Sequence, residues 1–367
     1  MKCRTVSNVQ AQLVADACDN FPAAILFALT EAPAIAMKRL RNEFCTMPLR
    51  IVLMGTGDFA VPPFRGLLNS PHEIVGVLTQ PDKTGRGHHQ HANPVKELAV
   101  AKSVPVFQPE RINRPEMLDT LRSLQADVFI VAAYGQILKP ELLAIPRLGA
   151  FNLHGSLLPR HRGAAPVQYA IWKGDPITGV TIFQIEQTLD SGPVVGRIET
   201  PIADSETSGE LMLRLAELSV LLTLEVVRQL DTGKAVFELQ DTALVTLAPK
   251  IPREAGVIDW SKSGHEIDCQ IRAMQPWPKA SSVLQRYDHL PLRCIVSQVT
   301  AVRDSDVPQN HSVPGRVQGH LGRLLVGTGD GWLEILKLQP EGRKAVDGRS
   351  FVNGYPLADG DSFLANT

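Results

Sequence analysis

The sequence predicts an α/β fold, in which a mostly parallel, Rossmann-like doubly wound sheet is followed by a small C-terminal OB-like β-barrel domain. Three observations support this prediction. The chain has 367 residues, which is the length of about two ordinary domains. In its first two thirds, near-continuous apolar runs alternate with amphipathic helical patterns, as in parallel sheets covered on both faces. In its last third, short alternating runs lie between Gly, Pro and Asp turns, a pattern typical of small barrels.

The first part of the chain supplies the sheet and its covering helices. Strands are expected at residues 50–55, 73–80, 104–108, 127–135, 149–154, 178–185 and 192–202. Helices are expected at residues 94–102, 115–125 and 208–233, the last of them closed by Gly233. The strands lack polar alternation, so we expect both faces of the sheet to be buried.

The second part of the chain is organised differently. The proline-rich stretch "LAPKIPREAGVIDW" is irregular and reads as part of a linker. A short helix is expected at 264–274, followed by strands. These strands are expected at residues 281–287, 292–302, 315–320 and 324–339. The resulting division is an N-terminal extension (1–47), a sheet domain (48–235), a linker (236–253), an OB-like domain (254–359) and a tail (360–367).

Composition excludes several classes of protein. The formal net charge is −1, so any nucleic-acid or membrane surface must be local. The five cysteines form no C-x-x-C pair, which argues against a zinc site or disulfide framework and favours a reducing cytoplasm. No apolar run is long enough to span a bilayer, so we expect no membrane association. We also expect the chain to act as a monomer.

The first 47 residues differ from the rest. The apolar run "FPAAILFALTEAPAIAM" is interrupted by Glu31 and by prolines, and basic residues follow it, which is the reverse of a secretory signal. Met47 then opens "MPLRIVLMG", which resembles the beginning of a folded domain. We interpret this extension as poorly ordered, or as the result of a start codon placed too early, and expect a chain truncated at Met47 to remain active.

A glycine motif follows the first expected strand. Gly55, Gly57 and Ala60 match the G-x-G-x-x-A pattern of dinucleotide-binding proteins. The acidic residue that should end the second strand is missing, because the chain continues through Thr79 and Gln80. Since that acid is half of the motif, a tight strand-to-helix turn is favoured over an NAD site.

A second motif lies at the end of the fifth expected strand. Asn152 and His154 are two residues apart, so both side chains point to the same face, at the strand end where open α/β sheets bind ligands. An asparagine amide can donate to an oxyanion, and a histidine can move a proton near neutral pH. His154 taken alone could equally be a buried structural histidine. Asp190, in the turn "QTLDSGP", favours the functional interpretation, because its carboxylate could reach the same pocket.

A polar loop, "PDKTGRGHHQH", is the third candidate. Arg86 lies between Gly85 and Gly87, and a guanidinium on such a loop could reach a phosphate or a base edge. A solvated surface loop explains the composition equally well. The three nearby histidines, His88, His89 and His91, lack a completing Cys or carboxylate, so no metal site is expected.

These motifs together resemble a known family. "FNLHGSLLPRHRGAAP" followed by "TGVTIFQIEQTLDSGPVV" is similar to the formyl-transfer domain of enzymes that use 10-formyltetrahydrofolate. "GTGDFAVPP", "TQPDKTGRGHH", "RAMQPWPKA" and "TGDGWLEILKLQPEGRKA" resemble the branch of that family that acts on charged initiator tRNA. The resemblance runs from about Pro48 to about Asn353 and leaves out the N-terminal extension.

The resemblance implies an activity and a set of residues. The activity is transfer of a formyl group from 10-formyltetrahydrofolate, without a metal, to the α-amino group of methionine on initiator methionyl-tRNA. The alternative is a folate-dependent formyltransferase acting on an amino sugar or nucleotide amine. The implied catalytic residues are Asn152, His154 and Asp190. The implied folate-binding residues are Ser156, Leu157, Leu158 and Pro159. The implied tRNA contacts are the Gly85, Arg86 and Gly87 loop and the C-terminal barrel.

The sequence departs from the family pattern at two places. Gly57 stands where the family has a proline, which should loosen the turn and creates the match to the dinucleotide motif. His88 and His89 stand where lysines are frequent, so the charge of this loop should depend on pH.

Overall fold

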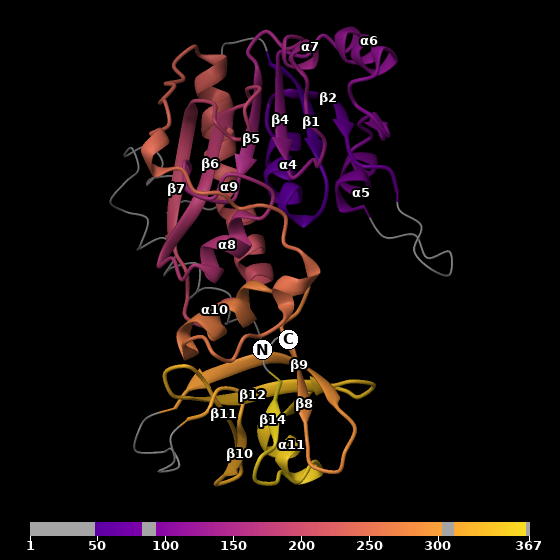
Figure 1. The fold of residues 1–367 in the computed structure, drawn as a ribbon. Helices are drawn as coiled ribbons and strands as arrows, with labels where there is room; N and C mark the ends of the chain where they lie inside the picture. Colours follow the sequence, from indigo (N-terminus) through magenta and orange to yellow (C-terminus); the bar gives the residue numbers. More distant parts are fainter. Residues whose placement is uncertain (1–47, 83–92, 303–311, 365–367) are drawn as a thin grey trace, which may run out of the picture. The chain divides into compact units, whose positions relative to one another are not determined.

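The computed structural model describes residues 48–82, 93–302 and 312–364, and its ribbon is drawn in Figure 1. The catalytic part contains a seven-stranded sheet in the order β3-β2-β1-β4-β5-β6-β7. The first five strands in this order, β3, β2, β1, β4 and β5, are parallel to one another. Strand β6 is antiparallel to β5, and β7 is antiparallel to β6. The sheet is therefore mostly parallel, as expected. Its strands are β1 (Arg50–Gly55), β2 (Glu73–Leu78), β3 (Val106–Phe107), β4 (Val128–Ala132), β5 (Ala150–His154), β6 (Ile177–Gln184) and β7 (Val194–Pro201).

Helices cover both faces of this sheet, and strand β1 shows why. Its residues Ile51, Val52, Leu53 and Met54 have no exposed surface. Ile51 and Leu53 belong to one core, while Val52 and Met54 belong to the other. The first core is closed by α4 (Val61–Leu68), α5 (Pro94–Ala101), α8 (Pro166–Trp172) and α9 (Ser208–Asp231). The second core is closed by α6 (Pro115–Ser123) and α7 (Pro140–Leu143).

The C-terminal part is an antiparallel sheet that nearly closes on itself. Its strands follow the order β10-β11-β12-β9-β8-β14, and β13 pairs with β12. Backbone hydrogen bonds join the two ends of that order: the Phe363 N–H donates to the Gly315 carbonyl over 2.8 Å, and the Val317 N–H donates to the Asp361 carbonyl over 3.0 Å. The OB-like barrel prediction is thereby confirmed.

The elements of this part have the following bounds. The strands are β8 (Ser281–Gln285), β9 (Leu292–Ala301), β10 (Val317–His320), β11 (Arg323–Gly327), β12 (Trp332–Pro340), β13 (Val346–Asp347) and β14 (Ser362–Phe363). The helices are α10 (Gly264–Ala273) and α11 (Gly348–Gly354). Short 3-10 turns are η1 (Asp58–Ala60), η2 (Thr242–Leu244) and η3 (Arg253–Gly256). The Trp260 ring stacks on Phe363 inside the core, with ring centroids 5.2 Å apart.

The glycine motif after β1 is a packing turn. A Cβ atom on Gly55 would lie 2.8 Å from the carbonyl oxygen of Ala132 on β4 and 2.8 Å from the Cβ atom of Ala60. Gly57 has a φ of 77°, which glycine adopts readily and which proline, fixed near −65°, cannot. The departure from the family pattern therefore gives this turn a backbone conformation that proline excludes.

Candidate active site

A cavity of about 860 Å³ opens at the carboxyl ends of β4 and β5. Asn152, His154 and Asp190 all line it, so the fold brings the three predicted catalytic residues to one place. Parallel strands direct their carboxyl ends to the same edge of the sheet, where the following loops can surround a ligand. The other walls come from residues 133–138 after β4, residues 185–189 after β6 and the connecting segment between the two domains.

His154 is held by a backbone carbonyl rather than by a side chain. Its Nε2 atom donates to the carbonyl oxygen of His161 over 2.9 Å. The ring is 5% exposed and meets the edge of Phe183 at an interplanar angle of 80°. Because Nε2 carries the hydrogen, Nδ1 is the nitrogen that can accept a proton in the neutral ring.

The surroundings of His154 favour its neutral form. Burial lowers the pKa of the imidazole below the ordinary value of 6.5, and the nearby Asp190 carboxylate and the His161 carbonyl oppose that effect only in part. At neutral pH the ring is therefore uncharged, and Nδ1 is a base at the wall of the cavity.

Asp190 is placed by a strained turn and three hydrogen bonds. Its φ is 48°, in the left-handed region that aspartate tolerates better than most residues. One carboxylate oxygen, Oδ2, accepts from the Gly163 N–H over 2.7 Å. The Gln240 side-chain amide donates to the carbonyl oxygens of Asp190 over 2.9 Å and Gly192 over 2.8 Å. The turn is therefore fixed by Gly163, which binds the Asp190 carboxylate, and by Gln240, which binds two of its backbone carbonyls.

The Asp190 carboxylate reaches the pocket of His154 without hydrogen-bonding to its ring. Oδ2 lies 3.8 Å from Nδ1, which is too long for a hydrogen bond. The His161 carbonyl orients the ring instead. The gap leaves both Nδ1 and the carboxylate available to the same incoming group.

The four predicted folate-binding residues lie outside the lining of this cavity. Ser156 is fully buried, and its hydroxyl donates to the Arg160 carbonyl over 2.7 Å. Leu158 is 2% exposed, and it packs with Phe183 and Val194 in a small core. Neither Leu157 nor Pro159 is among the residues that line the cavity. In this structure the stretch supports the loop that carries His161.

Sequence reasoning missed the contribution of the connecting segment. Residues 236–253 are predicted to be a linker, and three of them, Leu247, Pro249 and Lys250, line the cavity. The segment runs beside the loop after β5, where the Arg162 N–H donates to the Thr246 carbonyl over 2.9 Å and the Ala248 N–H donates to the Arg162 carbonyl over 2.7 Å. Its irregular, proline-rich pattern gave no signal of this pairing.

Two predicted features fall on residues 83–92. Gly85, Arg86 and Gly87, and the histidines that follow them, lie outside the described residues. Among residues 48–82, 93–302 and 312–364, no group of three or more His, Cys, Asp or Glu side chains is placed to hold a metal ion. In the same ranges, no helix is long and apolar enough to cross a membrane.

Comparison with known proteins agrees with this geometry. Residues 49–227 match the model of the formyl transferase family, and residues 250–356 match the model of its C-terminal domain. A methionyl-tRNA formyltransferase of Rhodopirellula baltica is 42% identical over 330 residues, which are 86% of this chain and 97% of that protein. The chain belongs to the formyl transferase family. It is thus a formyl-transferring enzyme.

Solved structures share the fold at low sequence identity. A sugar 3N-formyl transferase, WlaRD, solved with dTDP and 5-N-formyl-tetrahydrofolate, superposes with a TM-score of 0.57 at 16% identity, covering 81% of this chain and 100% of that one. The N-formyltransferase of Helicobacter canadensis superposes with a TM-score of 0.57 at 16% sequence identity. This match covers 79% of this chain and 99% of that one. HypX of Aquifex aeolicus, solved with tetrahydrofolic acid, superposes with a TM-score of 0.55 at 15% sequence identity, but the match covers only 51% of HypX.

Proposed function

We propose that this enzyme transfers the formyl group of 10-formyltetrahydrofolate to the α-amino group of methionine on initiator methionyl-tRNA. The observation that carries the proposal is the buried neutral base His154, which lines one cavity with Asn152 and Asp190. The 42% identity to a methionyl-tRNA formyltransferase selects the acceptor. We further propose that the chain works as a monomer in the cytoplasm, since both substrates are soluble.

The residues divide the chemistry between them. The free amine attacks the formyl carbon, and the carbonyl oxygen becomes an anion in the tetrahedral intermediate. The Asn152 amide donates to that anion. The amine proton passes to His154 Nδ1, with Asp190 Oδ2 beside it at 3.8 Å to stabilise the resulting imidazolium. The proton then moves to N10 of the folate as the bond between N10 and the formyl carbon breaks.

The folate fits the slot between residues 133–138 and residues 185–189. Both walls line the cavity, and they include the apolar side chains Ile137, Leu138, Ile185 and Leu189. Apolar walls suit a flat heterocycle, and the backbone amides and carbonyls of such loops supply its polar contacts. Ser156–Pro159 directly follow Gly155, which lines the cavity, and their predicted contact with the folate remains part of the proposal.

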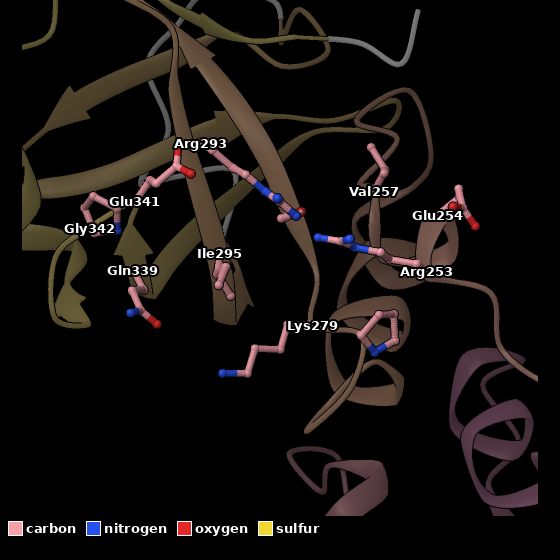
Figure 2. A pocket seen from close by; sticks show the side chains of 12 residues that line it. Arg253, Glu254, Val257, Lys279, Arg293, Ile295, Gln339, Glu341 and Gly342 are labelled. Carbon is pink, nitrogen blue, oxygen red and sulfur yellow. Dashed lines mark hydrogen bonds between the residues drawn. The ribbon is translucent and has the colours of Figure 1, made fainter. Parts of the chain in front are cut away.

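A second cavity, of about 510 Å³, gives the C-terminal domain a site for tRNA phosphates. Arg253, Lys279 and Arg293 line it together with two carboxylates, Glu254 and Glu341. Figure 2 shows that the side chains of Arg253 and Arg293 extend toward each other, whereas the side chain of Lys279 points away from them. Cationic side chains that line one groove can hold the phosphates of a bound nucleic acid. The loop of Arg86 would supply a further contact.

One assay tests the proposal. The protein is incubated with 10-formyltetrahydrofolate and with methionine-charged initiator or elongator tRNA, and formylmethionine is measured after hydrolysis of the tRNA ester. We expect formylation of the initiator tRNA and at most slow formylation of the elongator. No formylation of either tRNA would remove the proposed acceptor.

A further inference from the structure

A second histidine–aspartate pair lies directly behind His154. His161 and Asp175 are joined by a hydrogen bond of 2.6 Å between Nε2 and Oδ2. The side chain of His161 is 5% exposed and that of Asp175 13%, so this contact is largely shielded from water. Neither residue lines the catalytic cavity, and the reaction described above uses neither of them.

His161 has an unusual backbone conformation. Its φ is 61°, in the left-handed region that residues other than glycine adopt only when neighbouring contacts hold them there. In that conformation its carbonyl oxygen accepts the hydrogen of His154 Nε2 over 2.9 Å. The direction of this carbonyl therefore determines how the His154 ring is turned and which of its nitrogens carries the hydrogen.

Two contacts hold His161 in place. Its backbone N–H donates to the hydroxyl oxygen of Thr246, in the connecting segment, over 2.8 Å. Its side chain is held by Asp175 alone, since Nδ1 is buried with no hydrogen-bond partner among the described residues. Asp175 is itself fixed, because its other oxygen accepts from Arg160 over 2.7 Å and its N–H donates to the Ala170 carbonyl over 3.0 Å.

We propose that His161 and Asp175 form a positioning pair that aims the His161 carbonyl at His154 and so presents His154 Nδ1 to the substrate amine. The proposal deepens the proposed function, since it rests on His154 being the catalytic base. Both residues act through His154 and touch neither substrate.

The Asp175→Ala variant tests the pair by kinetics. Without the carboxylate the His161 ring loses its only side-chain hydrogen bond, and the carbonyl is no longer held in direction. We expect kcat to fall roughly tenfold to a hundredfold, the range that misaligned catalytic groups show, while KM for the formyl donor stays within about twofold. Asp175→Asn keeps an oxygen that can accept from His161 and should restore most of kcat.

A matched control separates positioning from folding. Asp127 is also an aspartate of low exposure that accepts from an arginine, Arg147, and from a backbone N–H, that of Arg50. It precedes β4, at the end of the strand away from the cavity. Asp127→Ala should lower Tm without a selective loss of kcat. A similar loss of kcat in both alanine variants would overturn the positioning role.

Nitrogen-15 NMR of the histidine rings measures the tautomer and the pKa of His154 in the free protein, without any substrate. In the wild type we expect His154 to carry its hydrogen on Nε2. In Asp175→Ala we expect a mixture of tautomers and a lower pKa for His154, because the carbonyl that favours its charged form is lost. The titratable groups next to His154 are Asp190 and His161, and three further charged residues line its cavity: Arg162, Glu186 and Lys250.

The combined variant completes the test. His161→Asn removes the ring yet suits a left-handed backbone. If the pair acts as one unit, the double variant with Asp175→Ala should be no slower than the slower single variant. Additive losses, or an unchanged His154 tautomer in Asp175→Ala, would overturn the proposal. A wild-type protein that shows the Nε2 tautomer but formylates no tRNA would instead refute the proposed function.

Discussion

The two nitrogens of His154 have different surroundings, and the proposed proton transfer depends on this difference. Nε2 is bound to the His161 carbonyl, so only Nδ1 can exchange a proton with a ligand in the cavity. The Asp190 carboxylate, held by the Gly163 N–H, lies beside Nδ1 and stabilises its charged form. In the proposed mechanism, base and carboxylate therefore act on the same side of the incoming amine.

Removing either group should abolish most of the turnover. We expect His154→Ala and Asp190→Ala each to lower kcat by about a hundredfold or more, the usual loss for a preorganised catalytic group. Binding of the folate should change little, because the cavity walls at 133–138 and 185–189 remain. Steady-state kinetics and calorimetric titration with the folate measure the two effects. His320→Ala, on β10, is the control, and near-normal turnover in either catalytic variant contradicts the assignment.

The charge state of His154 can be measured directly. Because burial lowers its pKa, we expect an NMR titration of the free protein to give a midpoint below 6.5. Asp190→Asn removes the negative charge that favours the imidazolium, so the midpoint should move lower still. The substrate amine titrates near neutrality and would obscure this group in kinetic profiles. A midpoint above 6.5, or a rise in Asp190→Asn, would contradict the electrostatic account.

At the scale of elements, the connecting segment belongs to the active site. Gln240 accepts from the Arg162 guanidinium over 2.7 Å and donates to the carbonyl oxygens of Asp190 and Gly192. One side chain thus joins the loop after β5 to the turn that carries Asp190, the carboxylate proposed to be catalytic.

Gln240→Ala should expose this coupling. Three groups lose a hydrogen-bond partner, so we expect the free energy of unfolding to fall by about 1–3 kcal/mol. The freed Asp190 turn should also lower kcat several-fold. Gln229→Ala, whose amide donates to Glu225 within α9, is the matched control and should leave kcat unchanged. Thermal unfolding and steady-state kinetics measure both quantities; a stability loss with wild-type kcat would limit Gln240 to a structural role.

The turn between β6 and β7 offers a second test at this scale. A Cβ atom on Gly192 would lie 1.8 Å from the carbonyl oxygen of Gln184, so the chain must shift to accept any side chain. Gly192→Ala should therefore destabilise the protein by about 1–3 kcal/mol and displace Asp190, two residues earlier. Gly331→Ala, with open space around it, is the control. Equal melting temperatures for the two variants would contradict this close approach.

Sequence patterns predicted these elements unequally. The seven strands of the first sheet and helices α5, α6, α9 and α10 were recognised, because their apolar periodicity persists for several residues. In the second sheet, β11 and β12 were predicted as a single run, residues 324–339, and the two-residue strands β13 and β14 were missed. Helices α7, α8 and α11 were also missed, since they have only 4, 7 and 7 residues and their amphipathic pattern is correspondingly short. The pairing of residues 246–248 with the loop after β5 depends on backbone contacts between distant segments, which no local pattern encodes.

The site was predicted to a similar degree. Asn152, His154 and Asp190 carry recognisable chemistry at strand ends, so their convergence could be expected, although their catalytic roles remain predictions. The orientation of the His154 ring could not be predicted from the sequence, because it depends on the left-handed backbone of His161. That conformation follows from contacts with Asp175 and Thr246, which are distant in the sequence.

At the scale of the whole molecule, a net charge of −1 requires that tRNA contacts be concentrated locally. The groove of Arg253, Lys279 and Arg293, which also holds Glu254 and Glu341, is our proposed place for such contacts. Each phosphate neutralised by a protein cation releases counterions, so binding must weaken as salt increases. The slope of log affinity against log salt therefore reports the number of phosphate contacts, and substituting one cation shows how many of them it makes.

The double variant Arg253→Gln, Arg293→Gln tests the groove. We expect KM for tRNA to rise roughly tenfold with kcat unchanged, since neither residue lines the catalytic cavity. The slope of log affinity against log salt should become shallower by about one for each lost phosphate contact. Arg349→Gln, at an exposed arginine on α11 of the same domain, is the control for the loss of an arginine outside the groove. If the double variant keeps the wild-type slope, as the Arg349→Gln control should, tRNA phosphates do not occupy this groove and must bind the enzyme elsewhere.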